Sequence, residues 1–176
     1  MTVNFLPVKD LINKLENNNL TIHEIMKIFY NKIDEKNDAL NAIISKIPYH
    51  DLDTQLNLSE KRRMGNKRLS PLDGLPIAIK DLEETQGILT TSGSKVFQNN
   101  IPKIDSQMVH NLKKSGCIII GKTNVPEFGI GSQTYNTIFG STKNPFDTKL
   151  TSGGSSGGAA AAVSAGMIPF ADGSDM

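Results

Sequence analysis

The chain of 176 residues has the length of a single domain, large enough to bury a sizeable core. Its 38% hydrophobic and 21% charged residues are typical of a soluble globular protein, and a net charge of +1 gives no reason to expect nucleic acid or an anionic membrane as a partner. It contains neither a membrane-length apolar stretch nor a secretory leader, and its single cysteine excludes an internal disulfide. We therefore expect a cytoplasmic protein in which Cys117 is a buried structural thiol.

The N-terminal forty residues predict two helices. Thr21 and Glu24 have the spacing of a capping box, and apolar residues recur at helical spacing over 22–33. The stretch Ala42–Ile47 predicts a short strand. The polar stretch Asp51–Lys67 predicts a helix followed by a loop.

The second half of the chain alternates between strands and helices. Leu75–Lys80 and Cys117–Ile120 are predicted strands, whereas Asp105–Lys114 and Gly157–Ala165 are predicted helices. Continuous apolar strands alternating with helices indicate an α/β fold, with a mixed, largely parallel sheet covered by helices. We expect one domain, with a helical lead-in over 1–70 and an α/β core over 71–176.

Three sequence patterns match known motifs without their chemistry. Gly116–Thr123 (GCIIIGKT) fits the P-loop consensus, but its four variable positions favour a buried strand over a phosphate-binding turn. Gly153–Gly157 (GGSSG) fits the nucleophile elbow, which needs a later histidine, whereas all three histidines precede Ser155 and none has metal-site spacing. The basic run Lys61–Arg68 lacks interleaved aromatic residues, so a solvated helix end is favoured over a polyanion site.

A lysine at the end of an apolar strand is a candidate for proton transfer. In Gly74–Asp81 (GLPIAIKD), Lys80 follows apolar residues that would place its amine in a partly desolvated interior. Desolvation disfavours the ammonium form, and a neutral lysine is a competent general base. The alternative is an exposed lysine at the strand end that pairs with Asp81.

The segment Thr151–Gly158 places four glycines around two serines, directly before a predicted helix. Glycines permit close approach of the backbone, and the N–H groups of a helix N-terminus can bind an anion. A functional loop is favoured over a flexible linker because Ala159–Ala162 continues as good helix-forming sequence.

Five segments in this order resemble the amidase signature family. They are Gly74–Asp81 (GLPIAIKD), Gly121–Pro126 (GKTNVP), Phe139–Pro145 (FGSTKNP), Ser152–Gly158 (SGGSSGG) and Ala171–Asp175 (ADGSD). The resemblance runs from about Gly74 to the last residue. It implies a mixed sheet wrapped by helices and an enzyme that hydrolyses or transfers amide groups without a metal or cofactor.

The resemblance also assigns roles to individual residues. Lys80 corresponds to the catalytic lysine, and Ser155 to a bridging serine that follows a cis peptide. The attacking serine is expected at position 179, four residues after Asp175, so we expect this chain to be an N-terminal piece that ends before it. Supporting and oxyanion-loop roles fall to Gly153, Gly154, Ser156, Asp175 and Met176, and a substrate pocket is expected around Phe128, Gly129, Gly131 and Ser132.

The intact protein is thus expected to be a hydrolase of linear carboxylic amides that uses a Ser–Ser–Lys relay on a small-molecule substrate. A general amidase is favoured over the A subunit of a tRNA-dependent amidotransferase, which would need partner subunits and charged tRNA; otherwise neither nucleic acid nor a membrane is expected as a partner. A non-catalytic module that retains the fold is a second alternative, and a nucleotide binder is the least favoured. The resemblance leaves a homo-oligomer open.

Overall fold

The computed structural model describes residues 2–174 and contains five α-helices, five strands and four short 3-10 helices within this range. The α-helices are α1 (Val8–Glu16), α2 (Ile22–Leu40), α3 (Asp53–Met64), α4 (Gln107–Lys114) and α5 (Gly157–Ser164). The strands are β1 (Ile43–Ile44), β2 (Pro76–Lys80), β3 (Ile118–Thr123), β4 (Tyr135–Asn136) and β5 (Gly140–Ser141). The 3-10 helices are Val3–Phe5, Tyr49–Leu52, Lys95–Phe97 and Glu127–Gly129.

The main sheet is mixed and has the strand order β1-β3-β2. β1 pairs with β3 in antiparallel fashion, and β2 pairs with β3 in parallel. A parallel bridge between Ala78 and Ala171 places the C-terminal segment beside the free edge of β2. β4 and β5 form a separate two-stranded hairpin.

β3 contains a bulge at Ile120, because Ile77 pairs with Ile119 whereas Ala78 pairs with Gly121. After the bulge, Lys80 is in register with Thr123. Residues that pair directly across a sheet share a face, and successive residues alternate between faces. The ends of β2 and β3 therefore direct alternate side chains toward the two helical layers.

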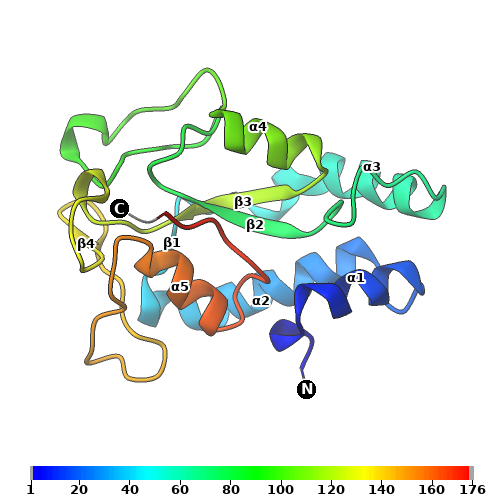
Figure 1. The fold of residues 1–176 in the computed structure, drawn as a ribbon, viewed down its shortest axis with the longest axis horizontal. Coiled ribbons are helices and arrows are strands. Elements are labelled where there is room, and N and C mark those ends of the chain that lie inside the picture. The colour runs from blue at the N-terminus through cyan, green and yellow to red at the C-terminus, as the bar shows by residue number, and fades with distance from the viewer. Residues whose placement is uncertain (1, 175–176) are drawn as a thin grey trace.

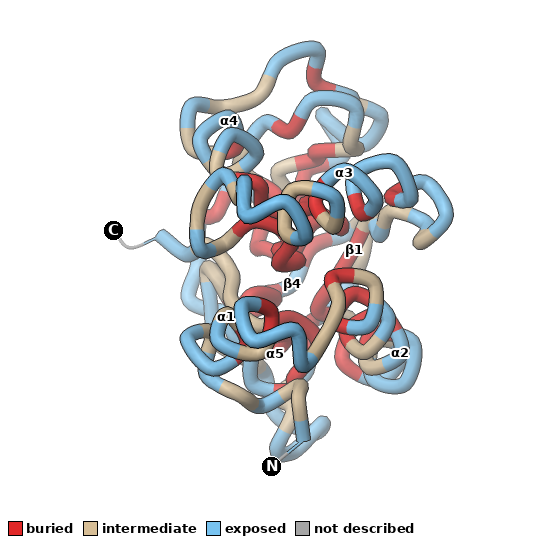
Figure 2. The backbone as a smooth tube through the Cα atoms, turned by 90° about the vertical axis from the view of Figure 1, so that its right-hand side faces the viewer, coloured by how far each residue is buried: buried red, intermediate tan, exposed pale blue. Residues whose placement is uncertain are grey.

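The sheet lies between two layers of helices, as Figure 1 shows: α4 covers one face, and α1, α2 and α5 lie on the other. Buried segments gather at the centre of the molecule around the sheet (Figure 2). Ala78, Ile118 and Ile120 contribute to the larger apolar core shared with α2 and α5. Ile77 and Ile79 contribute to the smaller core under α4.

The predicted elements are present, with boundaries that differ in two places. The strand expected over 42–47 is limited to β1, and the strand expected to end at Ile120 continues as far as Thr123. The second difference arises because Gly121–Thr123 pairs with β2 on one side, and its last two residues pair with β1 on the other. The capping box of Thr21 and Glu24 is formed as predicted.

The basic run at the end of α3 is not a solvated helix end, and this prediction was wrong. Arg62 pairs with Asp73, Arg63 with Glu60, and Arg68 with Glu16, and the three arginine side chains are at most 28% exposed. These ion pairs connect α3 and the loop after it to the start of β2 and to α1.

Cys117 is buried as expected, and burial raises the pKa of its thiol. None of the helices formed by residues 2–174 is both long and apolar enough to cross a membrane.

Candidate active site

Lys80 is the last residue of β2, and its side chain is buried: only 2% of the residue is exposed. The alternation of β2 directs Ala78 and Lys80 toward α5, whereas Ile77 and Ile79 face α4. The side chain does not pair with Asp81, whose carboxylate instead accepts hydrogen bonds from Thr91 and from the N–H of Gly93. The alternative of an exposed strand-end lysine is therefore wrong.

Three serine hydroxyls surround the Lys80 amine. Its Nζ atom donates to Oγ of Ser155 at 2.9 Å, to Oγ of Ser156 at 2.9 Å and to Oγ of Ser174 at 2.6 Å. Among residues 2–174, no carboxylate forms an ion pair with it. A neutral amine offers two N–H donors and one lone pair, so it can hydrogen-bond with three hydroxyls without carrying a charge.

The electrostatic environment of Lys80 favours the neutral amine. Burial lowers the pKa of Lys80 from 10.5, because removal from water disfavours the ammonium form. The negative charges of Asp172 and Glu83 act in the opposite direction, but the effect of burial is the larger. Lys80 can therefore accept a proton at a lower pH than a free lysine can.

The glycine loop that carries Ser155 is held by close backbone contacts. The Gly154–Ser155 peptide bond is cis, as the resemblance implied. A Cβ atom on Gly154 would lie 2.9 Å from the main-chain nitrogen of Gln133, so only glycine permits this approach. A later glycine of the loop, Gly157, donates its N–H to Oγ1 of Thr134 at 3.0 Å. These contacts place the two serines directly before α5 and beside the end of β2.

The segment after α5 brings Ser174 to the same place. Ser156 accepts a hydrogen bond from the Ser174 N–H at 3.2 Å, and Asp172 accepts one from the Lys80 N–H at 2.8 Å. Neither Ser174 nor Asp172 was among the residues predicted from the sequence; the only available signal was their closeness to the expected Asp175. Asp175 and Met176, predicted as supporting residues, lie outside the described residues.

Lys122, also missed, is a second buried lysine on the opposite face of the sheet from Lys80. It pairs in register with Ile79, is fully buried, and donates hydrogen bonds to the carbonyl of Glu83 and to Oγ1 of Thr85, the latter at 2.9 Å. Burial lowers the pKa of Lys122 to about 8, and nearby carboxylates, Asp81 first among them, oppose this shift. Its position within a buried strand is incompatible with a P-loop.

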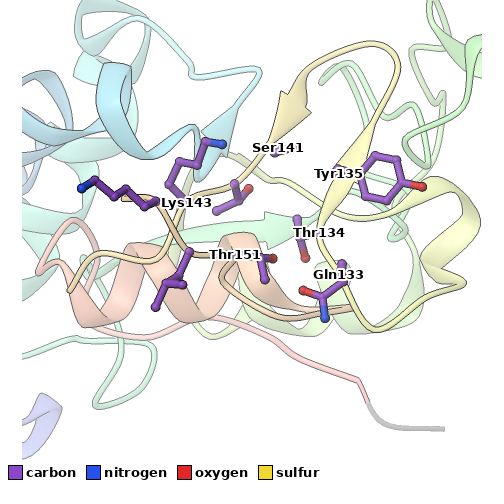
Figure 3. Close-up of a pocket in the computed structure, with 9 residues that line it drawn as sticks. Gln133, Thr134, Tyr135, Ser141, Lys143 and Thr151 are labelled. Carbon is purple, nitrogen blue, oxygen red and sulfur yellow. The ribbon is translucent and has the colours of Figure 1, made fainter. Parts of the chain in front are cut away.

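Two hollows flank the glycine loop. The first, of about 610 Å³, is lined by Phe128, Gly131 and Ser132 of the predicted substrate pocket, but not by Gly129. A Cβ atom on Gly154 would lie 3.0 Å from the Ser132 carbonyl carbon, so this hollow adjoins the glycine loop. The second, of about 480 Å³, is lined mainly by polar residues and two lysines of the β4–β5 region (Figure 3). Neither Lys80 nor Ser155 lines it.

A buried amine in contact with a serine hydroxyl can pass protons to and from a neighbouring nucleophile. Comparison with known proteins shows where this arrangement occurs. A family model described as Amidase matches residues 24–176, which is most of the chain. This chain is a member of the amidase signature family. Its fold is part of the amidase signature fold.

Members of the amidase signature family resemble the chain over nearly its whole length. It is 42% identical over 173 residues to the A subunit of the glutamyl-tRNA(Gln) amidotransferase of Saccharolobus solfataricus, covering 98% of this chain and 35% of that protein. The structure of a fatty acid amide hydrolase superposes with a TM-score of 0.89 at 26% identity, covering 98% of this chain and 30% of that one. The corresponding amidotransferase protein of Thermotoga maritima gives a TM-score of 0.75 at 29% identity, covering 96% and 33%. The chain thus spans about a third of the length of these relatives.

Proposed function

We propose that the whole protein breaks carboxylic amide bonds, with Lys80 as the general base and Ser155 as the bridging serine of a proton relay. The observation that carries this proposal is the 2.9 Å contact between the buried Lys80 amine and the Ser155 hydroxyl. Membership of the amidase signature family supports the same chemistry.

In this mechanism, neutral Lys80 takes a proton from Ser155 as Ser155 takes one from the attacking serine. The attacking oxygen forms a bond to the amide carbonyl carbon, and backbone N–H groups stabilise the resulting oxyanion. The relay then returns the proton to the leaving nitrogen, because an amide anion is a very poor leaving group. Water hydrolyses the acyl-enzyme. The attacking serine is the one expected at position 179, which follows the last of the 176 residues.

A direct test measures release of ammonia by the full-length protein from a panel of primary amides, including glutamine and asparagine. Lys80→Met should reduce the rate by about 10²–10⁴-fold, the usual contribution of a general base. Lys103→Met is the matched control, since Lys103 is exposed and lies in the loop before α4. Unchanged turnover in Lys80→Met would disprove the assignment.

A second candidate is the A subunit of a glutamyl-tRNA(Gln) amidotransferase. It is supported by the 42% identity to the relative with that name, compared with 26% for the fatty acid amide hydrolase. This function would use the same relay but would require partner subunits and charged tRNA. Recovery of partner subunits with the tagged protein, together with ammonia release that depends on them, would favour it. Hydrolysis of simple amides by the isolated full-length protein would favour a general amidase.

The remaining expectations stay predictions. A cytoplasmic location agrees with the single cysteine, which forms no internal disulfide. The supporting roles of Gly153 and Ser156, the substrate pocket near Phe128 and a homo-oligomeric state all need experiments on the full-length protein.

A further inference from the structure

Asp172 makes an unusual contact with Lys80, because its side chain binds the main chain of Lys80 rather than the amine. Oδ1 of Asp172 accepts the Lys80 N–H at 2.8 Å, although the two residues are 92 positions apart. The parallel bridge between Ala78 and Ala171 sets the two segments side by side just before this contact. A carboxylate thus takes the place of the main-chain carbonyl that a continuing parallel strand would supply.

The same short segment also reaches the other end of the Lys80 side chain. Two residues after Asp172, Oγ of Ser174 lies 2.6 Å from the Lys80 amine. The N–H of Ser174 donates to Ser156, which is itself a partner of the Lys80 amine. The segment 171–174 therefore holds Lys80 at both its backbone and its amine.

Asp172 is also one of the few charged groups near the Lys80 amine. Asp172 and Glu83 are the negative charges that act on it, and α5, on the serine side, has no ionisable residue. Lys122 and Glu83 act in turn on Asp172. Burial raises the pKa of the Asp172 carboxyl, whereas the Lys80 N–H and the Lys122 charge favour its ionised form.

We propose that Asp172 is a positioning residue for Lys80, whose carboxylate fixes the Lys80 main chain and supplies negative charge that acts on its buried amine. This inference rests on the proposed role of Lys80 as the base. When Lys80 accepts a proton from Ser155, a buried ammonium forms, and a nearby carboxylate stabilises it. Asp172 thereby balances the charge that the relay creates.

The test measures the Lys80 amine directly and needs no turnover. The full-length protein is labelled with [ε-13C]lysine, the Lys80 signal is identified by its loss in Lys80→Arg, and its pH titration is recorded by NMR. Asp172→Asn keeps the size and the acceptor oxygen but removes the charge. The Lys80 titration midpoint should therefore move to lower pH, as should that of Lys122, while the signals of surface lysines stay in place.

A second variant tests the main-chain contact. Asp172→Ala removes the acceptor, so the Lys80 amide should exchange with solvent about tenfold faster or more, whereas Asp172→Asn should retain most of its protection. Asp38→Asn is the control for both measurements, because Asp38 is exposed on α2. An unchanged Lys80 midpoint in Asp172→Asn overturns the inference, and so does an unchanged Lys80 exchange rate in Asp172→Ala. Neither result depends on amide hydrolysis, so the proposed function can fail or hold separately.

Discussion

The amine of Lys80 and the hydroxyl of Ser155 lie 2.9 Å apart, although the two residues are 75 positions apart in the chain. The contact exists because β2 ends at Lys80 and the loop before α5 ends at the adjacent serines. Ser155 differs from Ser156 in one respect, since Ser156 also accepts the Ser174 N–H and so has a structural role.

Replacing the two serines in turn tests this distinction. Ser155→Ala in the full-length protein should reduce kcat by about 10²–10⁴-fold, because the relay loses the hydroxyl that passes the proton. Ser156→Ala should reduce it less, by about tenfold, because what it loses is a hydrogen bond that orders the loop. Steady-state kinetics with a common amide substrate would measure both. A larger loss in Ser156→Ala would reverse the assignment of the two roles.

The pH dependence of hydrolysis should follow the protonation state of Lys80. Below its pKa the amine is protonated and cannot accept a proton, so kcat/KM should rise as pH increases through that pKa. Burial places the midpoint below 10.5. Lys80→Arg should remain inactive across the whole range, because arginine stays charged. A rate that falls with increasing pH over this range would contradict a neutral lysine base.

Lys122 should make folding stability depend on pH in the alkaline range. Its pKa is about 8 in the folded protein and 10.5 in a model lysine, so between these values the unfolded chain binds the extra proton. Stability should consequently rise with pH in this window for the wild type relative to Lys122→Met, which removes the titrating group. Denaturant unfolding at several pH values would measure the difference.

The comparison with Lys122→Met also removes the contributions of other groups, such as Cys117 and Tyr30, which titrate in both proteins. Lys103→Met, at an exposed position, should show the same pH dependence as the wild type. A stability difference between the wild type and Lys122→Met that does not vary with pH would show that Lys122 keeps its ordinary pKa.

Gly158 should be intolerant of any side chain. A Cβ atom there would lie 2.5 Å from the carbonyl oxygen of Asn124 and 2.8 Å from that of Ala42, and neither backbone atom can move aside easily. Gly158→Ala should therefore destabilise the protein by about 1–3 kcal/mol. In Gly173→Ala the nearest atom would lie at an ordinary 3.6 Å in Ser156, so this control should change stability by about 0.5 kcal/mol or less. Denaturant unfolding would measure both variants, and equal effects would contradict the close packing of α5.

Local sequence signals predicted the elements and half of the site. The capping box at Thr21 and the apolar run before Lys80 act over a few residues, so they can be read directly. Pairing Lys80 with Ser155 required the family resemblance, because no local rule relates residues so far apart. Ser174 and Asp172 could not be predicted, since their contacts depend on how the segment after α5 runs beside β2.

The bulge at Ile120 decides where the two buried amines lie. If β3 continued past Ile119 without it, Lys122 would fall opposite Lys80 instead of Ile79, and both side chains would share one face. Two lysines would then compete for the same three hydroxyls, and their ammonium forms would repel each other. The extra residue separates them, so that one amine lies among serines and the other among loop carbonyl and threonine oxygens. An irregularity of a single residue thus keeps a proton-carrying lysine and a structural lysine from interfering with each other.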